Sequence, residues 1–71
     1  MSTFAAFNYD KTIHNVVEVD KKGYDNCSSP KGAKVFQTGK NRIKLKSGHN
    51  YFICTITGHC QGGMKIDVTA S

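Results

Sequence analysis

Turn-forming residues interrupt this chain at short intervals, and no stretch keeps a helical spacing of apolar residues beyond two turns. The interruptions fall at Lys22-Gly23, Ser28–Gly32, Thr38–Asn41, Ser47–Asn50 and Thr57–Gly63. The apolar and aromatic runs between them are expected to be strands, at Ala5–Tyr9, Asn15–Glu18, Ala33–Gln37, Arg42–Leu45, Tyr51–Thr55 and Lys65–Thr69. Six short strands at this spacing predict an all-β sandwich or barrel.

Alternation within these runs indicates which side chains face the core. In the run Arg42–Leu45, the two apolar residues are expected to point inward and the two basic residues toward water. No linker divides the 71 residues, so residues 1–71 are expected to form one domain. A core of this size is marginal, which favours a disulfide or a bound metal as a supplement.

The chemically most informative stretch follows the run Tyr51–Thr55. Cys54, His59 and Met64 are spaced five residues apart, at the end of an apolar strand and along a glycine-rich loop. A thiolate, an imidazole and a thioether together suit copper better than calcium or magnesium. A blue copper site needs a second histidine, and His14 is the natural donor because it precedes a strand that can lie beside this loop.

Each of these residues also has an ordinary structural explanation. Cys54 could be a small buried apolar residue, Met64 could fill the core, and His59 could be a surface histidine. The four together favour a copper site. A structural zinc site is disfavoured because paired Cys-x-x-Cys motifs are absent from the sequence. His49 is expected at an exposed hairpin tip without a role.

Cys27 and Cys60 remain after Cys54 is assigned to the metal. They are expected to form a disulfide that ties the metal loop to an earlier turn, although two free thiols are the alternative. A disulfide would indicate an oxidising compartment. The sequence contains no run of about 20 apolar residues that could span a membrane and no visible signal peptide.

The chain is basic, with ten Lys and Arg against five Asp and Glu and a net charge of +5. A basic surface could bind nucleic acid, but no recognition motif or aromatic platform accompanies it, so no nucleic-acid partner is expected. Anionic cell-wall polymers or an acidic redox partner fit the charge equally well. The chain is expected to be a monomer.

Several segments resemble plantacyanins, the small basic blue copper proteins of the phytocyanin family. The resemblance runs from about Phe7 to the C-terminus, through the segments Phe7–Tyr9, His14–Val17, Gly32–Val35, Tyr51–Cys54 and Gly58–Lys65. It implies a cupredoxin-like Greek-key β-sandwich and one type 1 copper ion. It implies that His14, Cys54, His59 and Met64 are the copper ligands and that Cys27 and Cys60 form the disulfide. It also implies secretion to the extracellular matrix, in the apoplast or cell wall.

The sequence departs from the family pattern at two places. Thr57 stands where these proteins usually have proline, which should loosen the metal loop modestly. The usual signal peptide, first strand and tryptophan-containing segment are not seen, so the domain is expected to be a copy truncated at its N-terminus, with an uncovered sheet edge.

Two functions are compatible with these features. One is single-electron transfer by outer-sphere exchange between Cu(I) and Cu(II), in which the protein is an electron carrier and not an enzyme. The other is an extracellular signalling or cell-wall interaction protein of reproductive tissue, in which copper is structural or incidental.

Overall fold

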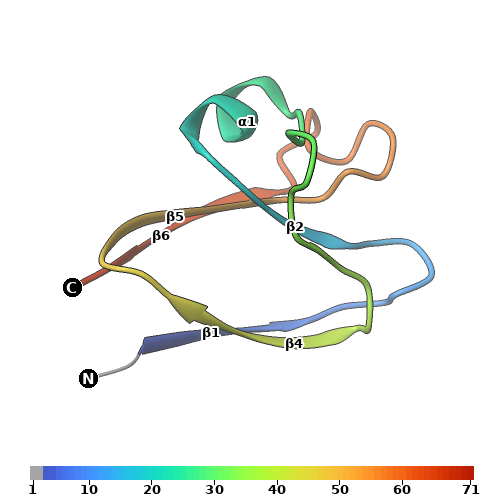
Figure 1. Cartoon of the computed structure of the whole chain (residues 1–71). Coiled ribbons are helices and arrows are strands. Elements are labelled where there is room, and N and C mark those ends of the chain that lie inside the picture. The colour runs from blue at the N-terminus through green and yellow to red at the C-terminus, as the bar shows by residue number, and fades with distance from the viewer. Residues whose placement is uncertain (1–2) are drawn as a thin grey trace.

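The computed structural model describes residues 3–71 and contains two antiparallel sheets that pack as two layers (Figure 1). The smaller sheet, here called sheet A, pairs β1 (Thr3–Asn8) with β4 (Lys40–Leu45). The larger one, sheet B, has the strand order β3-β2-β5-β6. Its strands are β2 (Val16–Val19), β3 (Val35–Phe36), β5 (Gly48–Ile53) and β6 (Lys65–Ala70). The nearly all-β sandwich expected from the sequence is therefore confirmed.

The principal core lies between the two sheets. Ile43 and Leu45 point inward from β4, as their alternation with basic residues predicted, and Phe52 fills the centre with 2% of its surface exposed. Phe7 of β1 meets Phe52 edge to face, with ring centroids 5.0 Å apart. This aromatic contact joins the two layers.

A second apolar cluster lies on the other face of sheet B, beneath α1 (Lys21–Asn26). Val17, Val19, Ile53 and Cys60 form its buried part, and Tyr24 packs against it. Sheet B is therefore covered on both faces, which explains the nearly continuous apolar sequence of β2.

The helix α1 was not expected from the sequence, which indicated only a turn at Lys22-Gly23. It begins because the Asp20 side chain accepts a hydrogen bond from the Gly23 amide at 2.8 Å. It ends at Cys27, which has a left-handed backbone with φ 53°. With six residues, it is too short to produce a recognisable helical pattern.

No helix in the described residues is long and apolar enough to cross a membrane. The six expected strands all appear; two of their ends coincide with the expected ones and the others are displaced by up to three residues. β5 begins earlier than expected, at Gly48. The side chain of Asn50, within β5, bonds back to Lys46 and closes the turn that precedes the strand. The buried Asn50 side chain accepts a hydrogen bond from the Lys46 amide at 3.1 Å and donates to the Lys46 carbonyl at 2.9 Å.

Candidate metal centre

Cys54 follows directly after β5, and the pairing of β5 with both its neighbours places it between two other chain segments. The β2–β5 register pairs Val17 with Ile53, so the chain before β2 runs beside Cys54. The β5–β6 register pairs Ile53 with Lys65, and the Cys54 amide donates to the Met64 carbonyl at 3.2 Å. The sheet thus brings residues distant in sequence to one strand end.

Three potential metal donors meet at this strand end. The Cys54 Sγ lies 3.9 Å from the His14 Nδ1 and 3.5 Å from the His59 Nδ1, and the three donor atoms lie within 4.8 Å of one another. Cys54 is 3% exposed, whereas both histidines are half-buried. The two imidazole rings have centroids 5.0 Å apart. The structure thus brings together three of the four residues expected from the sequence at donor-atom distances.

These distances suit one small metal ion. Three donors arranged trigonally at about 2.1 Å from an ion would be about 3.6 Å from one another, using bond lengths typical of nitrogen and sulfur ligands. The two sulfur–nitrogen distances, 3.9 and 3.5 Å, lie on either side of that value, and the two histidine donors lie within 4.8 Å of each other. A thiolate with two imidazoles is the trigonal donor set of blue copper sites.

Met64 lies next to this cluster in the loop that precedes β6. It lines an open groove of about 590 Å³ together with His14 and Cys54, and 43% of its surface is exposed. Its amide donates to the His59 carbonyl at 2.9 Å, which fixes the main chain between the two residues. The Met64 side chain thus borders the same groove as His14 and Cys54, and its role as a fourth donor stays a prediction.

His14 is positioned by a compact turn that begins at Asp10. The amides of Ile13 and His14 both donate to the Asp10 carbonyl, at 3.1 and 3.0 Å. The Asp10 carboxylate accepts hydrogen bonds from the Thr12 hydroxyl at 2.6 Å and the Thr12 amide at 2.9 Å. The Thr12 hydroxyl, followed by its amide, holds the pKa of the Asp10 carboxyl below its usual value of 3.8. The turn is thus stabilised with Asp10 ionised.

His59 lies on a loop of successive tight turns. The His59 amide donates to the Ile56 carbonyl at 3.0 Å, and the Gly62 amide donates to the Gly58 carbonyl at 3.0 Å. Gly58 and Gly63 adopt φ of 81° and 105°, a region that favours glycine. The glycines in this loop therefore allow the chain to bend back from His59 to Met64 within a few residues.

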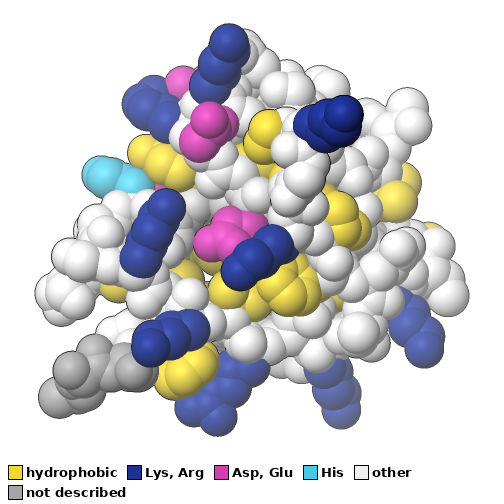
Figure 2. Space-filling view, viewed as in Figure 1, with side chains coloured by type: hydrophobic (Ala, Val, Ile, Leu, Met, Phe, Trp, Pro, Cys, Tyr) yellow, Lys and Arg dark blue, Asp and Glu magenta, His cyan; other side chains and the backbone are white. Residues whose placement is uncertain are grey.

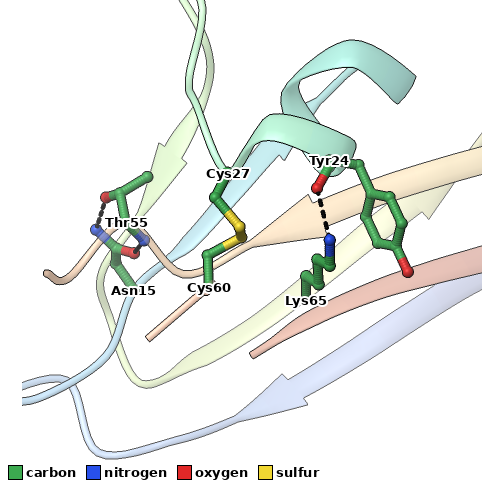
Figure 3. The surroundings of a disulfide bond; sticks show 6 residues. All are labelled: Asn15, Tyr24, Cys27, Thr55, Cys60 and Lys65. Atoms are coloured by element: carbon green, nitrogen blue, oxygen red, sulfur yellow. Dashed lines mark hydrogen bonds between the residues drawn. A yellow bond between two sulfur atoms is a disulfide. The ribbon is translucent and has the colours of Figure 1, made fainter. Parts of the chain in front are cut away.

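A polar pair next to the cluster, made by buried Asn15 and exposed Thr55, was not identified from the sequence. The Asn15 side chain donates to the Thr55 Oγ1 at 2.8 Å and accepts from the Thr55 amide at 2.8 Å (Figure 3). Asn15 follows His14 and Thr55 follows Cys54, so the pair fastens the two donor-bearing segments together. The sequence offered one indication of this pair, because each of the two polar residues directly follows a candidate ligand.

The Cys27–Cys60 disulfide expected from the sequence is present, with the two Cα atoms 5.5 Å apart. It connects the end of α1 to the loop at the residue after His59 (Figure 3). A second contact joins the same two regions, because the Lys65 ammonium donates to the Tyr24 carbonyl at 3.1 Å and lies over the Tyr24 ring. The helix region therefore anchors the donor loop at its middle, through Cys60, and at its C-terminal end, through Lys65.

His49 lies outside the cluster, as expected, but the sequence-based description of it was incomplete. It is part of β5 and not of a hairpin tip, and its Nδ1 lies 3.0 Å from both carboxylate oxygens of Asp67. Its ring stacks on Tyr51 with an interplanar angle of 8°. His49 thus has a structural partner on β6 while remaining exposed.

Comparison with known proteins gives a consistent result. A family model described as a plastocyanin-like domain matches residues 3–64. The chain is 52% identical to chemocyanin of Lilium longiflorum over 65 residues, which are 92% of this chain and 52% of that protein. It also superposes on cucumber basic protein, a blue copper protein, with a TM-score of 0.95 and 48% identity, covering 99% of this chain and 73% of that one. Spinach plantacyanin gives a TM-score of 0.95 at 50% identity, with 99% and 77% covered.

The chain therefore spans about half the length of the lily relative and about three quarters of the two solved structures. The resemblance noted in the sequence and the cupredoxin-like fold are both confirmed by these comparisons.

Proposed function

The chain belongs to the phytocyanins of the plastocyanin-like domain family, and from this premise we propose that it is a type 1 copper protein that carries single electrons. The observation that carries the proposal is the convergence of His14, Cys54 and His59, whose donor atoms lie within 4.8 Å of one another. No substrate-binding chemistry is needed for this activity. The proposed protein is an electron carrier and not an enzyme.

We propose that His14, Cys54 and His59 would hold the copper ion and that Met64 would be a weaker fourth ligand. Bound copper would supply a one-electron couple between Cu(I) and Cu(II). The Cys54 sulfur is buried at 3% exposure, so the surrounding apolar side chains exclude water from the strongest donor. The Met64 side chain borders the same groove as His14 and Cys54, and its flexible thioether is a soft donor.

The protein would contribute mainly by holding its donors still. Cys54 is fixed by backbone pairing on both sides, His14 by the Asp10 turn, and His59 by its loop and the neighbouring disulfide. Donors that need little movement between oxidation states lower the cost of reorganisation during electron transfer. The half-buried His59 ring is the proposed entry point for the electron.

The remaining features belong to the same proposal. Residues 1–71 are proposed to act as a single plastocyanin-like domain that is secreted to the extracellular matrix. The Cys27–Cys60 disulfide supports an oxidising location. The net charge of +5 favours an acidic redox partner.

Copper titration followed by absorption spectroscopy tests this proposal. One equivalent of Cu(II) should give an intense blue colour that ascorbate bleaches and ferricyanide restores. The Cys54→Ser variant should bind copper without that colour, because the sulfur-to-copper charge transfer is lost. His49→Ala, which removes a histidine outside the cluster, should keep the colour. A colourless native protein, or a blue Cys54→Ser variant, would contradict the proposal.

A further inference from the structure

The outer face of sheet A carries a row of positive charges. Lys40, Arg42 and Lys44 alternate along β4 with residues that point inward, and all three are exposed. Side chains on the same face of a strand belong to every second residue and are about 6.8 Å apart. We call these three residues the basic ladder. Lys46, just beyond β4, is also exposed and extends the row.

The strand beside the basic ladder brings no negative charge to it. In the β1–β4 register, Lys40, Arg42 and Lys44 face Asn8, Ala6 and Phe4. Neither strand contains an aspartate or a glutamate. The ion pairs found among residues 3–71 join Lys21 to Asp25 and His49 to Asp67, so neither neutralises the ladder.

One member of the ladder is held in place by an aromatic ring. The Arg42 guanidinium lies over the exposed Phe4 ring, 4.5 Å from its centroid. This contact keeps the cation on the sheet surface while leaving its donors free for a ligand. It also covers the aromatic face that a stacked nucleic-acid base would otherwise use.

Acidic residues lie elsewhere in the molecule. Figure 2 shows several Lys and Arg side chains along the lower part of the molecule, over β1 and β4, whereas the acidic side chains visible there are central or upper. The five acidic residues are in the turn after β1, in β2, around α1 and in β6: Asp10, Glu18, Asp20, Asp25 and Asp67. Four of the ten basic residues, from Lys40 to Lys46, therefore lie in one row with no acidic residue in sheet A.

We propose that the basic ladder binds a linear carboxylated polysaccharide laid along β4. Lysine ammonium groups are point charges that suit single carboxylates. The disulfide also indicates an oxidising, extracellular setting, where anionic polysaccharides are the abundant linear polyanions. This surface is separate from the metal cluster and does not depend on the proposed electron transfer.

Polygalacturonate is the probe for this proposal, and two triple variants separate local charge from total charge. Lys40→Gln/Arg42→Gln/Lys44→Gln removes the ladder. Lys22→Gln/Lys31→Gln/Lys34→Gln removes three exposed charges outside sheet A, so both variants have the same net charge. At low ionic strength, the ladder variant should bind polygalacturonate about tenfold more weakly than the native chain. The control variant should lose no more than about twofold.

Equal weakening of the two variants would overturn the proposal, because binding would then follow net charge alone. No measurable binding by the native chain would also overturn it. Tighter binding to double-stranded DNA than to polygalacturonate at the same ionic strength would reassign the face to nucleic acid. Each variant's melting temperature should match that of the native chain, and polygalacturonate binding is measured without added copper, so the result does not depend on the outcome of the copper titration.

Discussion

At the scale of single residues, the Asn15–Thr55 pair is the contact that ties one donor segment to the other. Asn15 is only 9% exposed, and both of its amide hydrogen-bonding groups are used on Thr55. The pair lies where the β2–β5 register continues past the last paired residues. It is therefore a positioning element for His14 and Cys54, because each of these residues is next to one member.

Replacing Asn15 with alanine should reduce the free energy of unfolding by about 1–3 kcal/mol, because the Thr55 amide and hydroxyl lose their buried partner. The same change should weaken copper binding. Thr55→Val removes only the Oγ1 acceptor, so it should cost less on both measures. Urea unfolding and copper titration of the two variants check this. An Asn15→Ala variant as stable as the native chain would show that the pair is dispensable.

The metal cluster was largely predictable because its chemistry is local in sequence. Cys54, His59 and Met64 are evenly spaced within one loop, and His14 was selected because it precedes a strand. The structure brings His14, Cys54 and His59 together as predicted, and their role as copper ligands stays a prediction. Asn15 was missed because its importance depends on a strand register that the sequence does not specify.

At the scale of secondary structure, α1 depends on one glycine. A Cβ atom on Gly23 would lie 2.6 Å from the Ser28 carbonyl oxygen and 2.8 Å from the Val19 Cβ. Gly23 is buried, so neither neighbour can move away freely. The helix can approach β2 this closely only because the residue has no side chain.

Gly23→Ala should therefore lower the free energy of unfolding by about 1–3 kcal/mol through overpacking, although alanine is the better helix former. Lys22→Ala, at the exposed neighbouring position, should leave stability within about 0.5 kcal/mol of the native value. Thermal unfolding of both variants measures the difference. A stabilised Gly23→Ala variant would mean that helix propensity outweighs packing at this site.

The strands were predictable and the helix was not, for a physical reason. β4 was predictable because its own residues alternate: Ile43 and Leu45 face the core, and the basic residues between them face water. The helix gains its stability from the Asp20 cap and from packing on Val19, neither of which produces a period in so short a segment. The choice of β1 as the partner of β4 was likewise hidden, because pairing is a property of the assembled sheet.

At the scale of the whole molecule, the disulfide is the strongest single constraint on the unfolded chain. Cys27 and Cys60 are separated by 33 residues, and closing a loop of that size contributes about 3.7 kcal/mol in the chain-entropy account. A domain of 71 residues has few other means of reaching ordinary stability.

A Cys27→Ser/Cys60→Ser variant should thus lose about 3–4 kcal/mol of unfolding free energy, a large share of the 5–15 kcal/mol typical of natural domains. Copper should recover part of that loss, since a metal bound only by the folded state raises the melting temperature. Melting curves of the variant with and without Cu(II) provide the measurement. A loss below about 1 kcal/mol would show that folded-state contacts, and not the cross-link, hold the loop.

The 40-residue separation between His14 and Cys54 also has a kinetic consequence. Contacts between distant parts of a chain form slowly, because the intervening loop must be closed before any interaction is gained. Cys54 and His59 belong to one short loop and can approach each other early, whereas His14 arrives only when β2 docks beside β5. A metal ion offered during refolding would therefore meet an incomplete set of donors until that late docking step. Binding of the metal ion would therefore mark a late step of folding and not an early one.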